Sequence, residues 1–178
     1  NHMAVIMANG LAGNEEINEE NEFYEEFCDA LYFINEKFAQ DIVHDGEGAG
    51  KFIQVNVKGA KSDADARLLA KSIVTNNLVK TAMYGEDANW GRVIAAMGAS
   101  GGYFDPSRVN MSFVSEKGSV LLMAGGEPVH FDENKAADVL SERDITVDIE
   151  LGDGIHSAKS WGCDLGHEYV RINGEYRS

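Results

Sequence analysis

Residues 78–98 read LVKTAMYGEDANWGRVIAAMG, and their pattern predicts three elements in succession. The apolar run Leu78–Met83 is brief for a helix and predicts a buried strand. Turn formers and two acids over residues 85–89 end that run. Trp90–Met97 then predicts a short helix, because an apolar pattern resumes directly after a capping side chain. A strand, a tight polar loop and a helix start together form a place suited to holding a polar group.

The same stretch also has a plainly structural interpretation. Asn89 or Asp87 caps the exposed amides of the following helix, the acids are solvated, and Trp90 lies in the core. The pattern alone favours this interpretation over a binding loop, because caps and turns occur in every fold.

The sequence on either side predicts an α+β fold. Lys51–Lys58 alternates apolar and polar residues as a half-buried strand does, and Ser62 and Asp63 then cap a helix. The inner stripe of that helix is expected to be Ala66, Leu69, Ala70 and Ile73. Later segments predict a hairpin, a helix and three strands, at residues 109–123, 133–140, 145–151, 156–161 and 169–172. The strand at 156–161 is expected to pair back on the strand before it. Irregular alternation with hairpins is typical of α+β proteins with mixed or antiparallel sheets and packed helices.

A long amphipathic helix is predicted near the amino terminus. Its apolar residues recur at helical spacing among many glutamates, and they are Phe23, Phe27, Leu31, Ile34 and Phe38. The early acids complement the positive end of the helix dipole. A stripe at this spacing predicts a surface that faces the core rather than a cofactor site.

The composition excludes several classes of function. The 178 residues carry 30 acids against 15 bases, and the net charge of −15 argues against nucleic acid and membrane lipid as partners. No stretch is long and apolar enough to span a membrane, and the length predicts one domain over residues 1–178. The 2 cysteines and 5 histidines lack the spacing of a disulfide framework or a metal site. We therefore expect a cytoplasmic protein without a metal.

A glycine-rich loop precedes the first predicted strand. Residues 44–50 read HDGEGAG, and the glycines allow positive φ and a close approach of the backbone to a ligand. It is not a phosphate loop, because no Gly-Lys-Ser/Thr follows and two acids would repel phosphate. Taken by itself, the loop is read more simply as a connection with solvated carboxylates.

Five segments resemble, in order, the motifs of one known family. They are ANGLAG at 8–13, DGEGAGKF at 45–52, KTAMYGEDANWGR at 80–92, WGCDLGHEYVRING at 161–174 and EYRS at 175–178. They resemble the ornithine acetyltransferases, also called bifunctional glutamate N-acetyltransferases, of arginine biosynthesis. Ala88 stands where the family usually has Pro, and Ser178 replaces the commoner Thr. The resemblance covers nearly the whole chain and implies the layered fold of the ornithine acetyltransferase and amino-terminal-nucleophile aminopeptidase superfamily.

The resemblance implies an activity and a site. Family members are made as a precursor that cleaves itself before a Thr, and the two chains stay associated. The exposed Thr takes the acetyl group from acetylornithine as an ester, with its own amine as a base, and glutamate then accepts it. The family's substrate contacts on this subunit fall on Glu47, Asn173 and Ser178. A carboxylate suits an ammonium group, whereas an amide and a hydroxyl suit a carboxylate.

The resemblance also implies what accompanies this chain. Its threonines are Thr75, Thr81 and Thr146, none at the start, so we expect most of the second subunit, with no catalytic residue of its own and the nucleophile upstream. The expected partners are the alpha subunit of the same precursor and the small substrates, in a higher oligomer of alpha–beta pairs. No cofactor is expected, and acetyl-CoA is a candidate second acetyl donor. Two alternatives stay open, namely a related amino-terminal-nucleophile aminopeptidase or amidase and a non-catalytic binding subunit.

Overall fold

The computed structural model describes residues 3–19 and 21–176. The chain divides into two compact units, Asn1–Ile42 and Val43–Ser178. The single domain expected over residues 1–178 remains a prediction.

The first unit contains most of a long helix. Residues 3–19 form no helix or strand, and α1 then extends over Tyr24–His44, which confirms the predicted amphipathic helix. Within this unit the predicted stripe does not face a core. No residue of α1 is buried, and the side chains of Phe23, Phe27 and Phe38 are 49%, 53% and 55% exposed. An apolar stripe needs a surface to cover it, and the described residues of this unit do not provide one.

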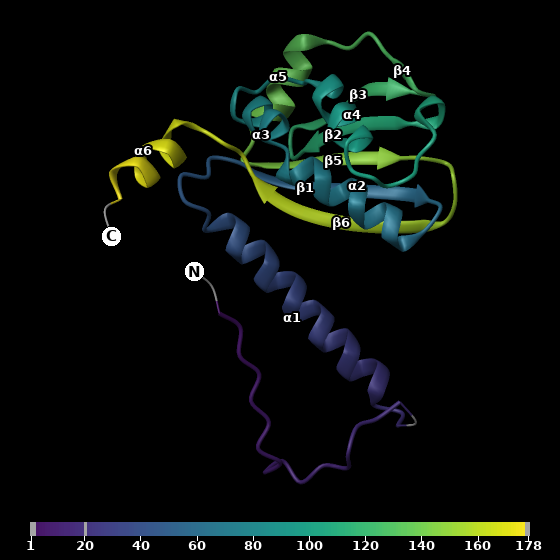
Figure 1. Cartoon of the computed structure of the whole chain (residues 1–178), viewed down its shortest axis with the longest axis vertical. Coiled ribbons are helices and arrows are strands. Elements are labelled where there is room, and N and C mark those ends of the chain that lie inside the picture. The colour runs from purple at the N-terminus through teal and green to yellow at the C-terminus, as the bar shows by residue number, and fades with distance from the viewer. Residues whose placement is uncertain (1–2, 20, 177–178) are drawn as a thin grey trace. The chain divides into compact units, whose positions relative to one another are not determined.

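The second unit is built on a mixed sheet (Figure 1). In the described part of the chain this sheet has six strands in the order β4-β3-β2-β5-β1-β6. The strands are β1 Phe52–Ala60, β2 Asn110–Ser115, β3 Gly118–Ala124, β4 Glu127–Pro128, β5 Asp144–Glu150 and β6 His156–Cys163. The central strand β1 pairs in parallel with β5 and antiparallel with β6. Because side chains alternate along a strand, Ile53, Val55 and Val57 share one face of β1, and all three are fully buried.

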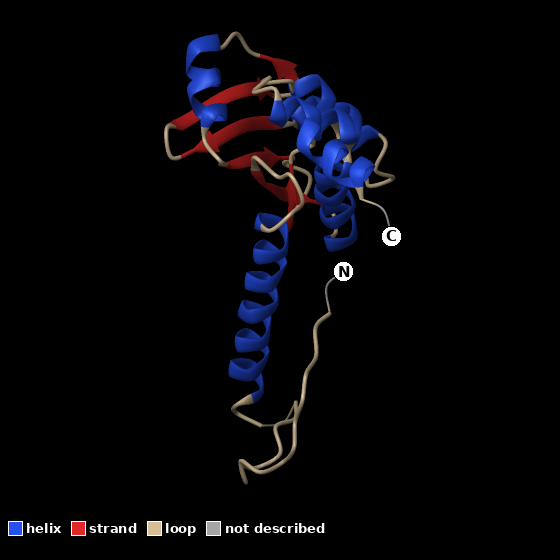
Figure 2. Cartoon of the chain, turned by 90° about the vertical axis from the view of Figure 1, so that its left-hand side faces the viewer, coloured by secondary structure: helices blue, strands red, loops and turns tan. Residues whose placement is uncertain are grey.

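Helices supply the other half of the core (Figure 2). They are α2 Asp63–Thr75, α3 Asn77–Tyr84, α4 Trp90–Gly98 and α5 Glu133–Ser141, all of which bury residues in the same cluster as the strands. The four predicted inner residues of α2 are fully buried, and Ser62 caps that helix by accepting from the amide of Asp65. A short 3-10 helix, Pro106–Arg108, and α6, His167–Glu175, complete the fold. The predicted α+β class is confirmed. No helix within the described ranges is long and apolar enough to cross a bilayer.

The segment Leu78–Met83 is helical, so the predicted strand is wrong. Asn76 begins α3, and its side chain accepts from the amides of Leu78 and Val79. Val79, Ala82 and Met83 then recur at helical spacing and are buried, while Leu78 is 61% exposed. A short helix is marginal alone but is stable when it is capped and packed on a core, which a length criterion does not capture.

The following helix starts as predicted. The side chain of Asn89 accepts from the amide of Arg92 at 3.1 Å, so Asn89 caps α4. Asp87 does not cap it. Its carboxylate instead accepts from the side-chain amide of Asn89 at 2.9 Å. Trp90 is half-buried against the core rather than fully enclosed.

Two predictions about the carboxyl-terminal third are corrected. β6 does not pair back on β5, because β1 lies between them and pairs with both. Residues 169–172 belong to helix α6, not to a strand. The run Tyr-Val-Arg-Ile has high strand propensity, but strand propensity depends on context and these residues lie outside the sheet.

Candidate substrate-binding site

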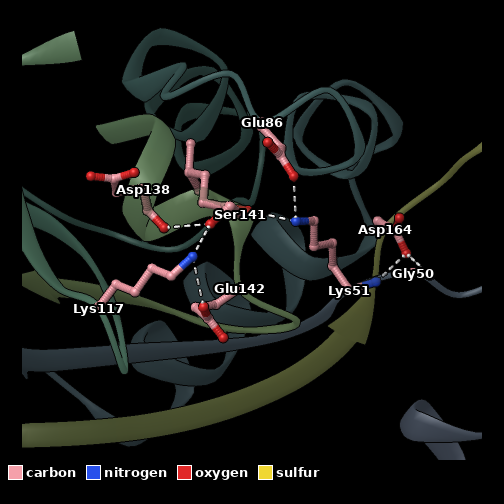
Figure 3. Close-up of polar contacts among 9 residues, drawn as sticks. Gly50, Lys51, Glu86, Lys117, Asp138, Ser141, Glu142 and Asp164 are labelled. Carbon is pink, nitrogen blue, oxygen red and sulfur yellow. Dashed lines mark hydrogen bonds and ion pairs between the residues drawn. The ribbon is translucent and has the colours of Figure 1, made fainter. Parts of the chain in front are cut away.

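Lys51 lies where three segments of the chain come together (Figure 3). Its side chain is 11% exposed, and its ammonium group donates to Glu86 Oε1 at 2.8 Å and to the carbonyl oxygen of Leu140 at 2.6 Å. Glu86 belongs to the GEDANWGR segment, and Leu140 lies in the last turn of α5, where a cation also suits the helix dipole. One lysine therefore ties the start of β1 to the turn after α3 and to the end of α5.

The carboxylate of Asp164 holds the backbone beside Lys51. Its Oδ1 accepts from the amides of Gly50 and Lys51 at 2.8 and 2.9 Å, although Asp164 is 113 positions from Lys51. Asp164 is buried, and a buried carboxylate is costly unless hydrogen bonds replace its water. Here the backbone amides do so. Asp164 therefore fixes the end of the glycine loop, residues 45–50, rather than only the turn beside it.

Glu86 has an uncommon backbone conformation for a residue with a side chain. Its φ of 54° lies in the left-handed region that glycine favours. Its amide donates to the carbonyl of Met83 at 3.3 Å, which closes the turn after α3. The turn thereby directs an acid toward the largely buried Lys51.

Two of the three predicted substrate contacts lie together. Glu47, in the glycine loop, accepts through Oε2 from Asn173 Nδ2 at 3.1 Å, across 126 positions of sequence. Asn173 Nδ2 also donates to the carbonyl of Tyr169 at 3.0 Å, one turn earlier in α6. Both side chains are exposed. The third predicted contact, Ser178, lies outside the described residues.

The glycine loop packs closely on the start of α6. Gly48 has a φ of 68°, and a Cβ atom there would lie 2.6 Å from the amide nitrogen of Tyr169. Only glycine fits this position without a shift of backbone. The close approach places Glu47 beside the helix that carries Asn173.

Charges on α6 are largely paired with one another. Arg171 donates to both carboxylate oxygens of Glu168 and also to Glu175. The hydrogen bond from Arg171 and its positive charge lower the pKa of the Glu168 carboxyl. Glu168 therefore stays ionised and paired, whereas the described partner of Glu47 is the neutral amide of Asn173.

This arrangement is suited to binding rather than to covalent chemistry. A free carboxylate can take an ammonium group, and an amide can donate to a carboxylate. The hydroxyls of Thr75 and Thr81 donate to backbone carbonyls of their own helices. No group of three or more His, Cys, Asp or Glu side chains in the described ranges is placed to hold a metal ion.

The same segments identify the chain by comparison with known proteins. A model of the ArgJ family matches residues 1–178. The chain belongs to the ArgJ family. It is 48% identical over all 178 residues to the arginine biosynthesis bifunctional protein ArgJ of Thermotoga neapolitana, and it spans 45% of that protein. It is 44% identical to the mitochondrial ArgJ protein of Schizosaccharomyces pombe, of which it spans 40%.

A solved ArgJ structure has the same fold. The crystal structure of the bifunctional ArgJ protein from Bacillus halodurans superposes with a TM-score of 0.88 at 41% sequence identity. The match covers 97% of this chain and 79% of that chain. The chain thus spans less than half of the curated ArgJ relatives and most of one chain of the solved structure.

Sequence reasoning missed the residues that join these ArgJ-family motifs. Lys51, Glu86 and Asp164 each stand in a quoted motif, yet their contacts link the DGEGAGKF segment to the other two. The available signal was Asp164, an acid that follows a strand and stands near glycines. Such an acid, when buried, needs amide donors.

Proposed function

We propose that this chain is the second subunit of an amino-acid N-acetyltransferase of arginine biosynthesis. The enzyme moves the acetyl group of N2-acetylornithine to glutamate, as a glutamate N-acetyltransferase. The observation that carries the proposal is the contact between Glu47 and Asn173 in a chain of the ArgJ family. The two residues come from segments far apart in sequence and carry complementary groups for an amino acid.

The proposed reaction is a double displacement. The hydroxyl of a threonine outside this chain attacks the acetyl carbonyl, its proton passes to the leaving nitrogen, and ornithine departs as the amine. The acetyl-threonine ester is then attacked by the amine of glutamate, which regenerates the hydroxyl and releases N-acetylglutamate. One pocket serves both half-reactions, because donor and acceptor are both amino acids.

Glu47 and Asn173 take the binding roles in this proposal. Acetylornithine has a single cationic group, its side-chain ammonium, because its other nitrogen is acylated. Glu47 binds that ammonium, while Asn173 and Ser178 bind the substrate carboxylate. Two observations support this division: the described partner of Glu47 is a neutral amide, and the amide of Asn173 already donates to a carboxylate, that of Glu47.

The remaining proposals concern the whole protein. The partner is the alpha subunit released from the same precursor by self-cleavage, and two alpha–beta pairs form a heterotetramer in the cytoplasm. The span of 45% of a curated relative supports a partner of about the same size. Acetyl-CoA serves as a second acetyl donor in the bifunctional version of this activity.

The proposal is tested with Glu47→Gln in the complete two-subunit protein. Loss of one charge-assisted contact costs about 1.5–3 kcal/mol, so kcat/KM for acetylornithine should fall roughly ten- to a hundredfold. Ornithine release and N-acetylglutamate formation are both measured. The control is Glu127→Gln, an exposed glutamate on β4. Equal kinetics in the two variants would show that Glu47 does not bind the substrate.

A further inference from the structure

We propose that Asp164 is a positioning residue of the ArgJ-family site, which sets Glu47 against Asn173 without contacting substrate. The inference rests on the proposed function, because it concerns the same pocket. Asp164 is the one buried residue with a charged side chain among those the structure describes, at 4% exposure. Its Oδ1 is bonded to two backbone amides of the glycine-loop end.

Asp164 fixes the end of the glycine loop. The amides of Gly50 and Lys51 both point at Asp164 Oδ1, and Oδ2 lies 3.1 Å from where a Cβ of Gly50 would stand. The carboxylate thus occupies the space that a side chain at residue 50 would need. Figure 3 shows Asp164 facing this backbone, on the far side of Lys51 from Glu86.

Asp164 also fixes the entry to α6. The amide of Asp164 donates to the carbonyl of Lys51 at 3.3 Å, and the amide of Leu165 donates to the carbonyl of Lys80 at 3.3 Å. A Cβ on Gly166 would lie 2.3 Å from the ring of Tyr84, so the chain is tightly packed where α6 begins. The helix that carries Asn173 therefore starts from a defined point.

These contacts connect Asp164 both to the loop that carries Glu47 and to the helix that carries Asn173. Glu47 directly precedes Gly48, which abuts α6, and it lies three residues before Gly50, where Asp164 holds the loop end. Its exposed side chain has little packing of its own, so its position depends on the backbone. Release of the loop end would move the Glu47 carboxylate relative to Asn173.

A double-mutant cycle in the complete two-subunit protein tests the inference. Asp164→Ala should lower kcat/KM for acetylornithine about ten- to a hundredfold, as expected for displaced binding groups. In a Glu47→Gln background the same change should cost at most about threefold, because the group being positioned is already disabled. Asp164→Asn retains an oxygen acceptor for both amides and should stay within about threefold of the parent.

Controls separate positioning from general stability. Asp132→Ala removes another carboxylate that accepts from two backbone amides, those of Asn134 and Lys135, at the start of α5. It should leave kcat/KM within about twofold even where it lowers the melting temperature. If Asp164→Ala does not fold, Gly50→Ala replaces it in the cycle, since the new methyl group would press on Asp164 Oδ2.

The outcomes distinguish the two proposals. Equal losses from Asp164→Ala in both backgrounds, with Glu47→Gln itself impaired, would overturn the positioning role alone. If Glu47→Gln is fully active, the substrate site is wrong. Amide hydrogen exchange then decides whether Asp164 still governs the loop. Faster exchange over residues 45–51 in Asp164→Ala than in the parent, with unchanged exchange in α2, would support the hold of Asp164 on the loop. Unchanged exchange over both segments would overturn it.

Discussion

Lys51 shows how a single charged side chain contributes when it is mostly buried. Lys51→Met keeps the apolar stem but removes the bonds to Glu86 and to the carbonyl of Leu140. We expect a loss of about 1–2 kcal/mol in the free energy of unfolding, because a largely buried carbonyl loses a charged donor. Urea denaturation measures it. The matched control is Lys58→Met, whose 3.3 Å pair with Asp148 is exposed and should contribute less than about 0.5 kcal/mol. Equal losses would show that burial of Lys51 is irrelevant.

Asp65 offers a test of a shifted pKa. The hydrogen bond from the hydroxyl of Ser62, together with the amide of Tyr103, lowers the pKa of the Asp65 carboxyl below its ordinary value of 3.8. A carboxyl with a depressed pKa adds stability above pH 3.8 and loses it as the pH falls through the lower folded value.

Ser62→Ala should therefore raise the pKa of Asp65 toward 3.8 and shrink the acid-dependent part of stability. An NMR titration of the carboxyl carbons measures this shift. Asp105, whose pKa is lowered by Ser107 in the same way, is the internal reference and should not move. An Asp65 titration identical in parent and variant would show that the Ser62 hydroxyl does not act on it.

At the scale of elements, the apolar stripe of α1 has no covering surface within its own unit. We infer that the alpha subunit of the proposed precursor covers it, since the chain spans 45% of a curated relative and nothing described in that unit buries α1. Phe27→Asp should then weaken association with that subunit by tenfold or more, because a charge would be buried. Co-purification from cells that express the whole precursor measures it. Gln40→Glu adds a charge on another side of α1 and should leave association intact.

Sequence patterns predicted most helices and strands correctly. They failed where the local residue pattern and the packing against distant parts of the chain favour different structures. The stripe of α2 was predicted because its period is helical over its full length. The run Leu78–Met83 is helical because Asn76 caps it and the core selects one face, and α6 is helical against its strand propensity. Glu47 and Asn173 were predicted through the family resemblance. The contacts of Asp164 were not predicted, because hydrogen bonds to distant backbone amides leave no spacing in the sequence.

At the scale of the whole molecule, this chain alone should not transfer acetyl groups. The proposed nucleophile lies outside it, and the Thr75 and Thr81 hydroxyls are bonded to helix backbone. Ornithine release from acetylornithine by the isolated chain should equal the blank, while the complete protein turns over. Turnover by the purified chain, free of any other subunit, would overturn the placement of the nucleophile.

The pairing of β1 affects how the chain folds during its synthesis. β1 ends at Ala60, but both of its neighbours, β5 and β6, begin only at Asp144 and His156. A ribosome adds roughly 5–20 residues per second, so this apolar strand waits on the order of ten seconds without a partner. During that interval its open edges can pair with another nascent chain. A ribosome that stalls before β5 therefore leaves a product prone to aggregation, and chaperones that bind exposed strands are needed most in that window.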